Sequence, residues 1–213
     1  MKKLMTATAA LFCLSQLPAM AQQQEFSFYG GIQESPHSTV KIGTEKIGAG
    51  WEGKSFSSPP YYGLRYTRWM DERSGWSINY AHSKAYSNAK TRSQYGYQVL
   101  EFTDGVNPIT LNYLRKFDAL GGWTPYAGVG VGFAVPHVEV QREGSPVKTS
   151  EFQFGGGPVF RASLGGKRQI NDKWGWFVEY DFHYVMLDVK HAGEAVKTNL
   201  IHNALNVGLN YRF

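Results

Sequence analysis

The last twelve residues constrain the fold most strongly, because their side chains alternate strictly between two kinds. The apolar set comprises Leu205, Val207, Leu209, Tyr211 and Phe213, and the residues between them are polar or small. A period of two is typical of a β-strand with one apolar face. About 9–11 residues are enough for a tilted strand to cross a bilayer. The aromatic end of the apolar face is typical of a membrane–water interface, so this strand predicts a membrane β-barrel.

Seven further segments alternate in the same way, at residues 25–37, 60–70, 75–86, 107–117, 124–137, 158–170 and 174–187. The connections are tight at 71–74, 118–122 and 171–173, and long at 38–59, 87–106, 138–157 and 188–201. This alternation is typical of barrels with short periplasmic turns and longer extracellular loops. We therefore predict an all-β chain that forms an eight-stranded, antiparallel, up-and-down transmembrane β-barrel with four longer extracellular loops.

The N-terminus predicts export from the cytoplasm. Lys2 and Lys3 precede a short apolar stretch, and Ala19-Met20-Ala21 has the pattern of a cleavage site. We predict a signal peptide at residues 1–21 and one barrel domain at residues 22–213, located in the outer membrane of a Gram-negative cell. Cys13 is the only cysteine and lies in the signal, so the mature chain has no thiol for a disulfide, a zinc site or a nucleophile.

The charge of the mature chain excludes some functions. Without Lys2 and Lys3, 20 basic residues remain against 17 acidic ones, a net charge of +3 that gives no indication of nucleic-acid binding. A soluble periplasmic β-domain is the alternative fold, but a soluble barrel keeps its large apolar residues inside. Here the large aromatic residues alternate with glycine, asparagine and charged residues. Eight strands leave an interior that side chains fill, so we expect no diffusion pore.

The inward parity of the strands carries polar and charged residues, namely Arg65, Arg161, Glu179, Asp181, His183, Asn206 and Arg212, and of these Arg65, Arg161, Glu179 and Asp181 can pair. Buried charges must be paired, because an isolated charge costs several kcal/mol. We therefore predict an ion-pair network that plugs the barrel. A proton relay that includes His183 is the alternative.

Histidines and carboxylates gather at the extracellular ends of the strands. Imidazole and carboxylate groups together make acid–base pairs or bind a divalent metal ion. The candidate catalytic residues are His37, His82, Asp104 and His137. The candidate metal ligands are His37, Glu52, His137 and Glu139. The alternative is a purely structural role, in which these histidines end strands and face lipid head groups. His82 and His137 continue the outward parity of their strands, so they meet the membrane unless a bulge turns them inward.

The rim segments resemble one family, the outer-membrane lipid A oxidases of alphaproteobacteria. The resemblance covers nearly the whole mature chain and is carried by residues 27–31, 36–38, 50–56, 59–63, 99–105, 124–126 and 136–140. It implies oxidation of the proximal glucosamine of lipid A to 2-aminogluconate by molecular oxygen, with hydrogen peroxide as the by-product. It also implies lipopolysaccharide as the partner of a monomeric barrel.

The resemblance suggests where the substrate binds. The candidate substrate-binding residues are Trp51, Tyr62, Lys54 and Lys84, since lysines attract lipid A phosphates. No dinucleotide fingerprint is present, so neither a flavin nor a nicotinamide is expected. Oxygen reacts poorly with closed-shell organic molecules, so a bound divalent metal ion is a hypothesis.

Two other functions compete with the oxidase. One is a non-catalytic outer-membrane barrel that stabilises the envelope or presents its loops to partners, since small barrels host both kinds of function. The other is a lipid A deacylase with a serine–histidine pair, for which His82-Ser83 and His37-Ser38 are the candidates. Adjacent residues on a strand face opposite sides, so neither pair serves as nucleophile and base by itself.

Overall fold

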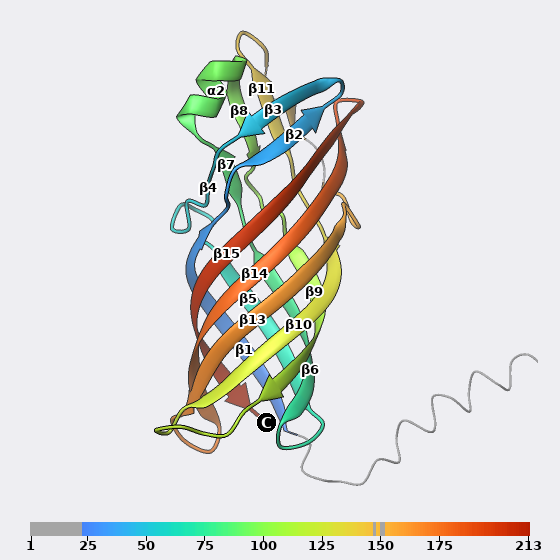
Figure 1. Ribbon diagram of the computed structural model, residues 1–213. Helices are drawn as coiled ribbons and strands as arrows, with labels where there is room; N and C mark the ends of the chain where they lie inside the picture. Colours follow the sequence, from blue (N-terminus) through green and yellow to red (C-terminus); the bar gives the residue numbers. More distant parts are fainter. Residues whose placement is uncertain (1–22, 147, 150–151) are drawn as a thin grey trace, which may run out of the picture.

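The computed structural model describes residues 23–146, 148–149 and 152–213, and the predicted signal peptide lies outside these ranges. Eight antiparallel strands of the described chain form a closed barrel (Figure 1). They are β1 (Gln24–Glu34), β5 (Tyr62–Trp69), β6 (Ser74–His82), β9 (Pro108–Lys116), β10 (Thr124–Ala134), β13 (Pro158–Gln169), β14 (Trp174–His191) and β15 (Glu194–Arg212). The last strand pairs with the first over ten residues, from Glu25↔Arg212 to Glu34↔Asn203, so the predicted barrel is confirmed.

The outer wall of the barrel is apolar, as the alternation predicts. Exposed large side chains are found on every side of it, for example Phe28 on β1, Leu111 on β9, Val131 on β10 and Val207 on β15, each 56–58% exposed. A soluble protein rarely exposes an apolar surface of this extent. An outward apolar band around a closed sheet is the form in which β-strands cross an outer membrane.

The lumen is polar and closed. Glu179 accepts hydrogen bonds from Nη1 of Arg65 and Nη2 of Arg161, both at 3.0 Å, and Arg65 Nη2 also contacts it. Arg161 Nη2 donates to Asp181 at 3.0 Å. All four side chains are buried, which confirms the predicted ion-pair network.

The extracellular end is built differently from the prediction of four loops. β14 and β15 run well past the barrel and join at a turn whose residues Ala192 and Gly193 have φ of 50° and 86°. The predicted loop at 188–201 is therefore wrong, because that segment is a continuous hairpin. Buried Val189 and Val196 alternate here with exposed Lys190 and Lys197, which is a strand pattern. The many charged residues made the segment resemble a loop in the sequence.

The remaining extracellular segments also carry secondary structure. β2 (Ser38–Ile42) pairs with β15, and β3 (Glu45–Ala49) pairs with β2. A second sheet has the order β12-β11-β8-β7-β4, formed by Lys148–Thr149, Glu139–Arg142, Tyr97–Phe102, Ala85–Ser87 and Trp51–Glu52. The helix α2 (Ala89–Tyr95) begins at Asn88, whose side chain accepts from Thr91 N at 2.9 Å. No helix within the described ranges has the length and apolar character needed to cross a membrane.

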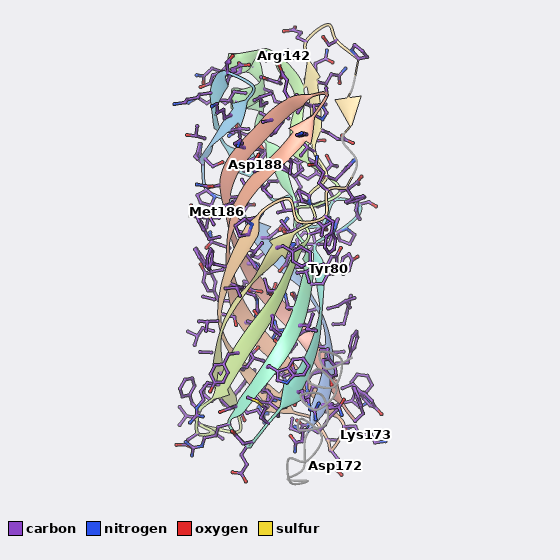
Figure 2. The ribbon with its side chains drawn as sticks, turned by 90° about the vertical axis from the view of Figure 1, so that its right-hand side faces the viewer. Tyr80, Arg142, Asp172, Lys173, Met186 and Asp188 are labelled. Atoms are coloured by element: carbon purple, nitrogen blue, oxygen red, sulfur yellow. The ribbon has the colours of Figure 1, made fainter. Side chains whose placement is uncertain are left out.

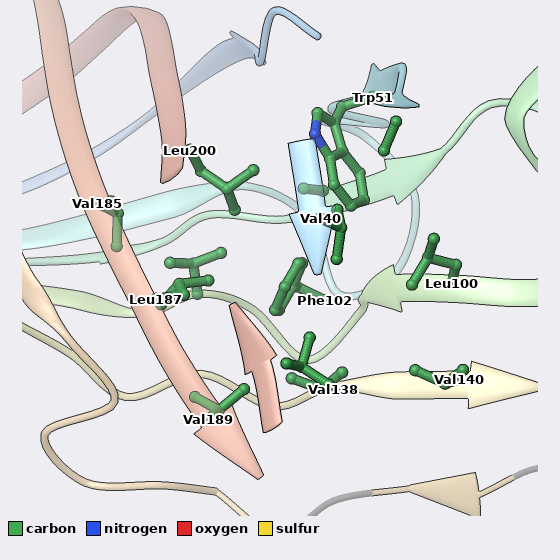
Figure 3. Close-up of a cluster of buried hydrophobic side chains, with 14 of the residues drawn as sticks. Val40, Trp51, Leu100, Phe102, Val138, Val140, Val185, Leu187, Val189 and Leu200 are labelled. Carbon is green, nitrogen blue, oxygen red and sulfur yellow. The ribbon is translucent and has the colours of Figure 1, made fainter. Parts of the chain in front are cut away.

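A buried apolar cluster joins the two sheets. Val40, Trp51 and Phe102 meet the extended hairpin at Leu187 and Leu200 (Figure 3). This core holds the extracellular segments as a compact cap on the barrel, while Asp172 and Lys173 mark the opposite, short-turn end (Figure 2).

The cap also covers a strand edge. Beyond the end of β13, Asp188 N on β14 donates to Gly156 O at 2.9 Å, and at Lys190 the side chain of Gln153 takes the place of a strand. Its Nε2 donates to Lys190 O at 2.6 Å, and its Oε1 accepts from Lys190 N at 3.1 Å. Both backbone groups of Lys190 are thus satisfied by one amide.

We expect Glu179→Ala to destabilise the barrel by about 3–5 kcal/mol, because Arg65 and Arg161 lose the carboxylate that they share inside the lumen. The measurement is the urea midpoint of the folded protein in micelles. Asp188→Asn is the matched control, since Asp188 makes an exposed ion pair with Lys197 at 2.7 Å and the change is expected to cost no more than about 1 kcal/mol. Equal midpoints for the two variants would contradict a stabilising network.

Candidate functional site

The second sheet aligns acidic and phenolic side chains in one row. Glu52 is directly opposite Tyr86, Tyr86 is opposite Glu101, and Glu101 is opposite Glu139. Residues directly opposite one another project from the same face of a sheet. The alternate positions of these strands, such as Trp51 and Leu100, are buried in the apolar cluster of the cap. The row therefore projects from the opposite face of the sheet, away from that cluster.

A tight turn brings a carboxylate and an imidazole to this row. Asp104 Oδ2 lies 3.0 Å from Nδ1 of His137, and His137 N donates to Gly105 O at 3.0 Å. The turn needs positive φ at Gly105 (99°) and Asn107 (48°). Thr103 Oγ1 donates to Glu101 at 2.7 Å. We call Tyr86, Glu101, Asp104, His137 and Glu139 the rim site.

The charges of the rim site perturb one another. Partial burial and the nearby carboxylates of Glu101 and Asp104 raise the pKa of Glu139, and His137 opposes this rise. Burial and the same acidic surroundings raise the pKa of Tyr86. Glu139 therefore keeps its proton to a higher pH than an isolated carboxyl group does, and perturbed groups of this kind are common at functional sites.

Two lysines border the rim site beside Tyr86. Lys54 Nζ lies 4.5 Å from the centre of the Tyr86 ring, and Lys84 Nζ lies 5.5 Å from it. Lys84 is buried and donates to the carbonyls of Ser57 at 2.8 Å and Pro59 at 2.6 Å. Burial, followed by the charge of Lys54, lowers the pKa of Lys84. Lys54 is exposed and available to an anionic group.

The rim site adjoins the lipid-facing wall. The ring of His137 lies 4.9 Å from that of Phe152, and the ring of Phe154 lies 4.6 Å from that of Phe133, an outward residue of β10. Phe152 and Phe154 are 55% and 80% exposed. An apolar path therefore leads from the barrel wall to the imidazole of His137.

His82 occupies a neighbouring position at the rim. Its ring stacks on Tyr62 at 5.5 Å, and Nδ1 lies 3.0 Å from Asn107 Oδ1. His82 keeps the outward parity that the sequence predicts, but the turn at residues 104–107 covers it and leaves it 6% exposed. Within the described chain, Nε2 of His82 is buried and has no hydrogen-bond partner. Tyr62 is half-buried on the outer wall.

Other predicted site residues are not part of the rim site. His37 is exposed and lies beside Gly50 and Asn88. The role of Trp51 as a ligand contact is corrected, since its ring is buried against Phe102 at 5.8 Å and Nε1 donates to Ser38 at 2.8 Å. Glu52 is in the row and lies 3.7 Å from Lys54 Nζ.

The four candidate metal ligands, His37, Glu52, His137 and Glu139, are not assembled into a site. The described residues contain no group of three or more histidines or carboxylates placed to hold a metal ion. The metal ion stays a prediction.

One serine–histidine pair was missed by sequence reasoning. Ser35 Oγ lies 2.8 Å from Nδ1 of His202, across the seam where β1 meets β15. Both residues are buried, at 6% and 2% exposure. The two residues are 167 positions apart in sequence, so only the register of the closing strands reveals the pair. Burial in the lumen removes it from the acyl chains that a deacylase must reach.

Comparisons with known proteins do not identify a family for this chain. No family model matches the chain, and no curated protein is similar to it. Among solved structures, Neisserial surface protein A shares 12% identity, covers 90% of this chain and 97% of its own, and has a TM-score of 0.47. The outer membrane protein AlkL in DMPC lipid bilayers shares 15% identity, covers 93% of this chain and 96% of its own, and has a TM-score of 0.46. OprG from Pseudomonas aeruginosa shares 14% identity, covers 90% of this chain and 94% of its own, and has a TM-score of 0.42. The fold assignment therefore rests on this chain's own strand pairing.

We expect Glu139→Gln to stabilise the second sheet at pH 8 and to have no effect at pH 4. A carboxyl group with a raised pKa favours the folded state below its ordinary pKa of 4.5, and this contribution is lost as the pH rises through the raised value. The measurement is amide hydrogen exchange of β8 and β11, with variant and wild type compared at the same pH. Glu143→Gln, at an exposed position, is the control. Slower exchange in Glu139→Gln at pH 4 but not at pH 8 would show that the sign is wrong.

Proposed function

We propose that this barrel is an outer-membrane enzyme that oxidises the proximal glucosamine of lipid A to 2-aminogluconate with molecular oxygen. The observation that supports this most is the location of the His137–Asp104 pair, 3.0 Å apart, next to Phe152 at the lipid-facing rim. A substrate that keeps its acyl chains in the outer leaflet presents its sugar at this height. The reaction itself comes from the resemblance of the rim segments to lipid A oxidases.

The chemistry needs a base at the sugar C1. Oxidation of the hemiacetal breaks its C1–H and O–H bonds and forms a lactone, with two electrons and two protons passing to oxygen to give hydrogen peroxide. Water then opens the lactone to the acid, so the lipid gains one oxygen atom overall. In this proposal His137, whose Nδ1 lies 3.0 Å from Oδ2 of Asp104, takes the hydroxyl proton. The raised pKa of Glu139 makes it a carboxyl group able to return a proton nearby.

One exposed lysine at the border of the acidic rim site can meet an anionic lipid. Lys54 is exposed beside the rim site, and a lysine pairs well with a phosphate group. Lys84 is held by two carbonyls, so it supports the position of the 54–59 segment more than it contacts substrate.

A non-catalytic barrel is the second candidate function. The observation that favours it is the continuous apolar core of the cap, which makes the extracellular end a rigid structure in its own right. A barrel that only stabilises the membrane or presents a surface needs that rigidity and does not need the rim site.

Mass spectrometry of lipid A separates these functions. We expect cells that express the wild-type chain, in a host without this activity, to add one oxygen atom to lipid A only when oxygen is supplied. His137→Ala and Asp104→Asn are expected to lower the product at least about 100-fold, in the range that loss of general acid–base catalysis produces. His37→Ala tests another of the predicted catalytic histidines, and because His37 lies outside the rim site this variant also serves as the comparison. Unmodified lipid A with folded protein in the outer membrane would leave the non-catalytic barrel as the function.

Metal dependence has its own test. No step above is assigned to a metal, because the described residues lack a ligand group of three. Purified protein is treated with a chelator, freed of it, and assayed before and after addition of single divalent metals. Activity that disappears and returns with one metal would establish the predicted cofactor, and unchanged activity in a metal-free sample would exclude it.

A further inference from the structure

The lipid-facing wall is hollowed on one side of the barrel. A groove of about 850 Å³ lies across β6, β9, β10 and β13 and is open to the membrane. Its apolar lining includes Trp76, Leu111, Tyr113, Val129, Val131 and Phe160. Val131 and Phe160 lie toward the extracellular ends of β10 and β13, whereas Trp76 lies near the short-turn end of β6.

The register explains the hollow. Val129 stands directly between Tyr113 on β9 and Ala162 on β13, and Val131 stands between Leu111 and Phe160. Small side chains at Val129 and Ala162 thus lie among large ones, since Trp76 is directly opposite Tyr113. The floor of the groove is aliphatic and its walls are aromatic.

A line of apolar side chains connects the groove with the rim site. Val129, Val131 and Phe133 follow one another on the outward face of β10 and span about 13 Å at ~3.3 Å per residue. Phe133 contacts Phe154, and Phe152 of the same short segment contacts His137. One leaflet has a hydrocarbon depth of about 15 Å. Because barrel strands are tilted by about 35–45°, this path covers about 10 Å of that depth, roughly two thirds of the leaflet.

We propose that this groove binds one acyl chain of the lipid whose head group occupies the rim site. The occupant is an acyl chain, because the groove faces hydrocarbon and offers it almost no polar group. Its identity as a chain of lipid A rests on the proposed function. The head group is held by Lys54 and the rim site, and the groove sets which chain lies beneath it. Binding in the groove orients the sugar toward His137.

Native mass spectrometry of the full barrel in detergent, with added lipid A, tests this proposal. Val131→Trp fills the floor of the groove and is expected to lower retention of lipid A roughly tenfold, since the indole replaces the packing contacts of the chain. Val207→Trp is the matched control, because Val207 is 57% exposed and Val131 is 58% exposed on equivalent lipid-facing positions. Both variants are first shown to be folded by their heat-modifiable migration in gels.

The outcomes separate the groove from the reaction. Loss of retention in Val131→Trp alone supports the groove, even if the wild type does not oxidise lipid A and the proposed function fails. Equal retention in both variants, or no retention by the wild type, overturns the groove, even if lipid A is oxidised.

Discussion

Backbone hydrogen bonding in hydrocarbon is the constraint on which the rest of the structure depends. No water is available there to satisfy an unpaired N–H or C=O group, so a strand that crosses the membrane needs neighbours on both sides. The pairing of β1 with β15 meets this need by closing the sheet. Closure fixes the size of the lumen, and the lumen in turn forces Arg65, Arg161, Glu179 and Asp181 to share their charges.

Closure also explains why the rim site lies outside the lumen. The lumen is filled by paired charged side chains and leaves no room for a lipid. The lipid-facing wall is apolar and has no charged groups that could bind a lipid head group. The extracellular rim is where the two kinds of surface meet. There the turn of residues 103–107 places Asp104 and His137 above the aromatic end of β10, while the cap core supports them from behind.

The barrel could be predicted because the signals for its strands and turns are local. Period-two alternation and tight turns can be recognised within a few residues, and counting the strands along the chain gives an even number. The charged residues at inward positions also predicted the ion-pair network. The cap was less predictable. Segment 188–201 has a strand pattern, but its exposed Asp188, Lys190 and Lys197 have the composition of a loop.

The rim site was predicted only in part. The sequence pointed to Asp104 and His137, but the row through Tyr86 and Glu101 depends on pairings between β7, β8 and β11 that no local pattern fixes. Trp51 was misjudged for the same reason, since burial in the cap depends on distant partners.

The amide of Gln153 has a consequence for the cell surface as a whole. An outer membrane is crowded with barrels, and a hairpin that stands above its own barrel carries a free edge toward its neighbours. Exposed edges of this kind join into shared sheets, which would convert separate barrels into a two-dimensional aggregate. By occupying both backbone groups of Lys190, Gln153 removes one unpaired donor and one unpaired acceptor from this edge of the hairpin. A single side chain thus blunts a position at which an added strand would have to pair.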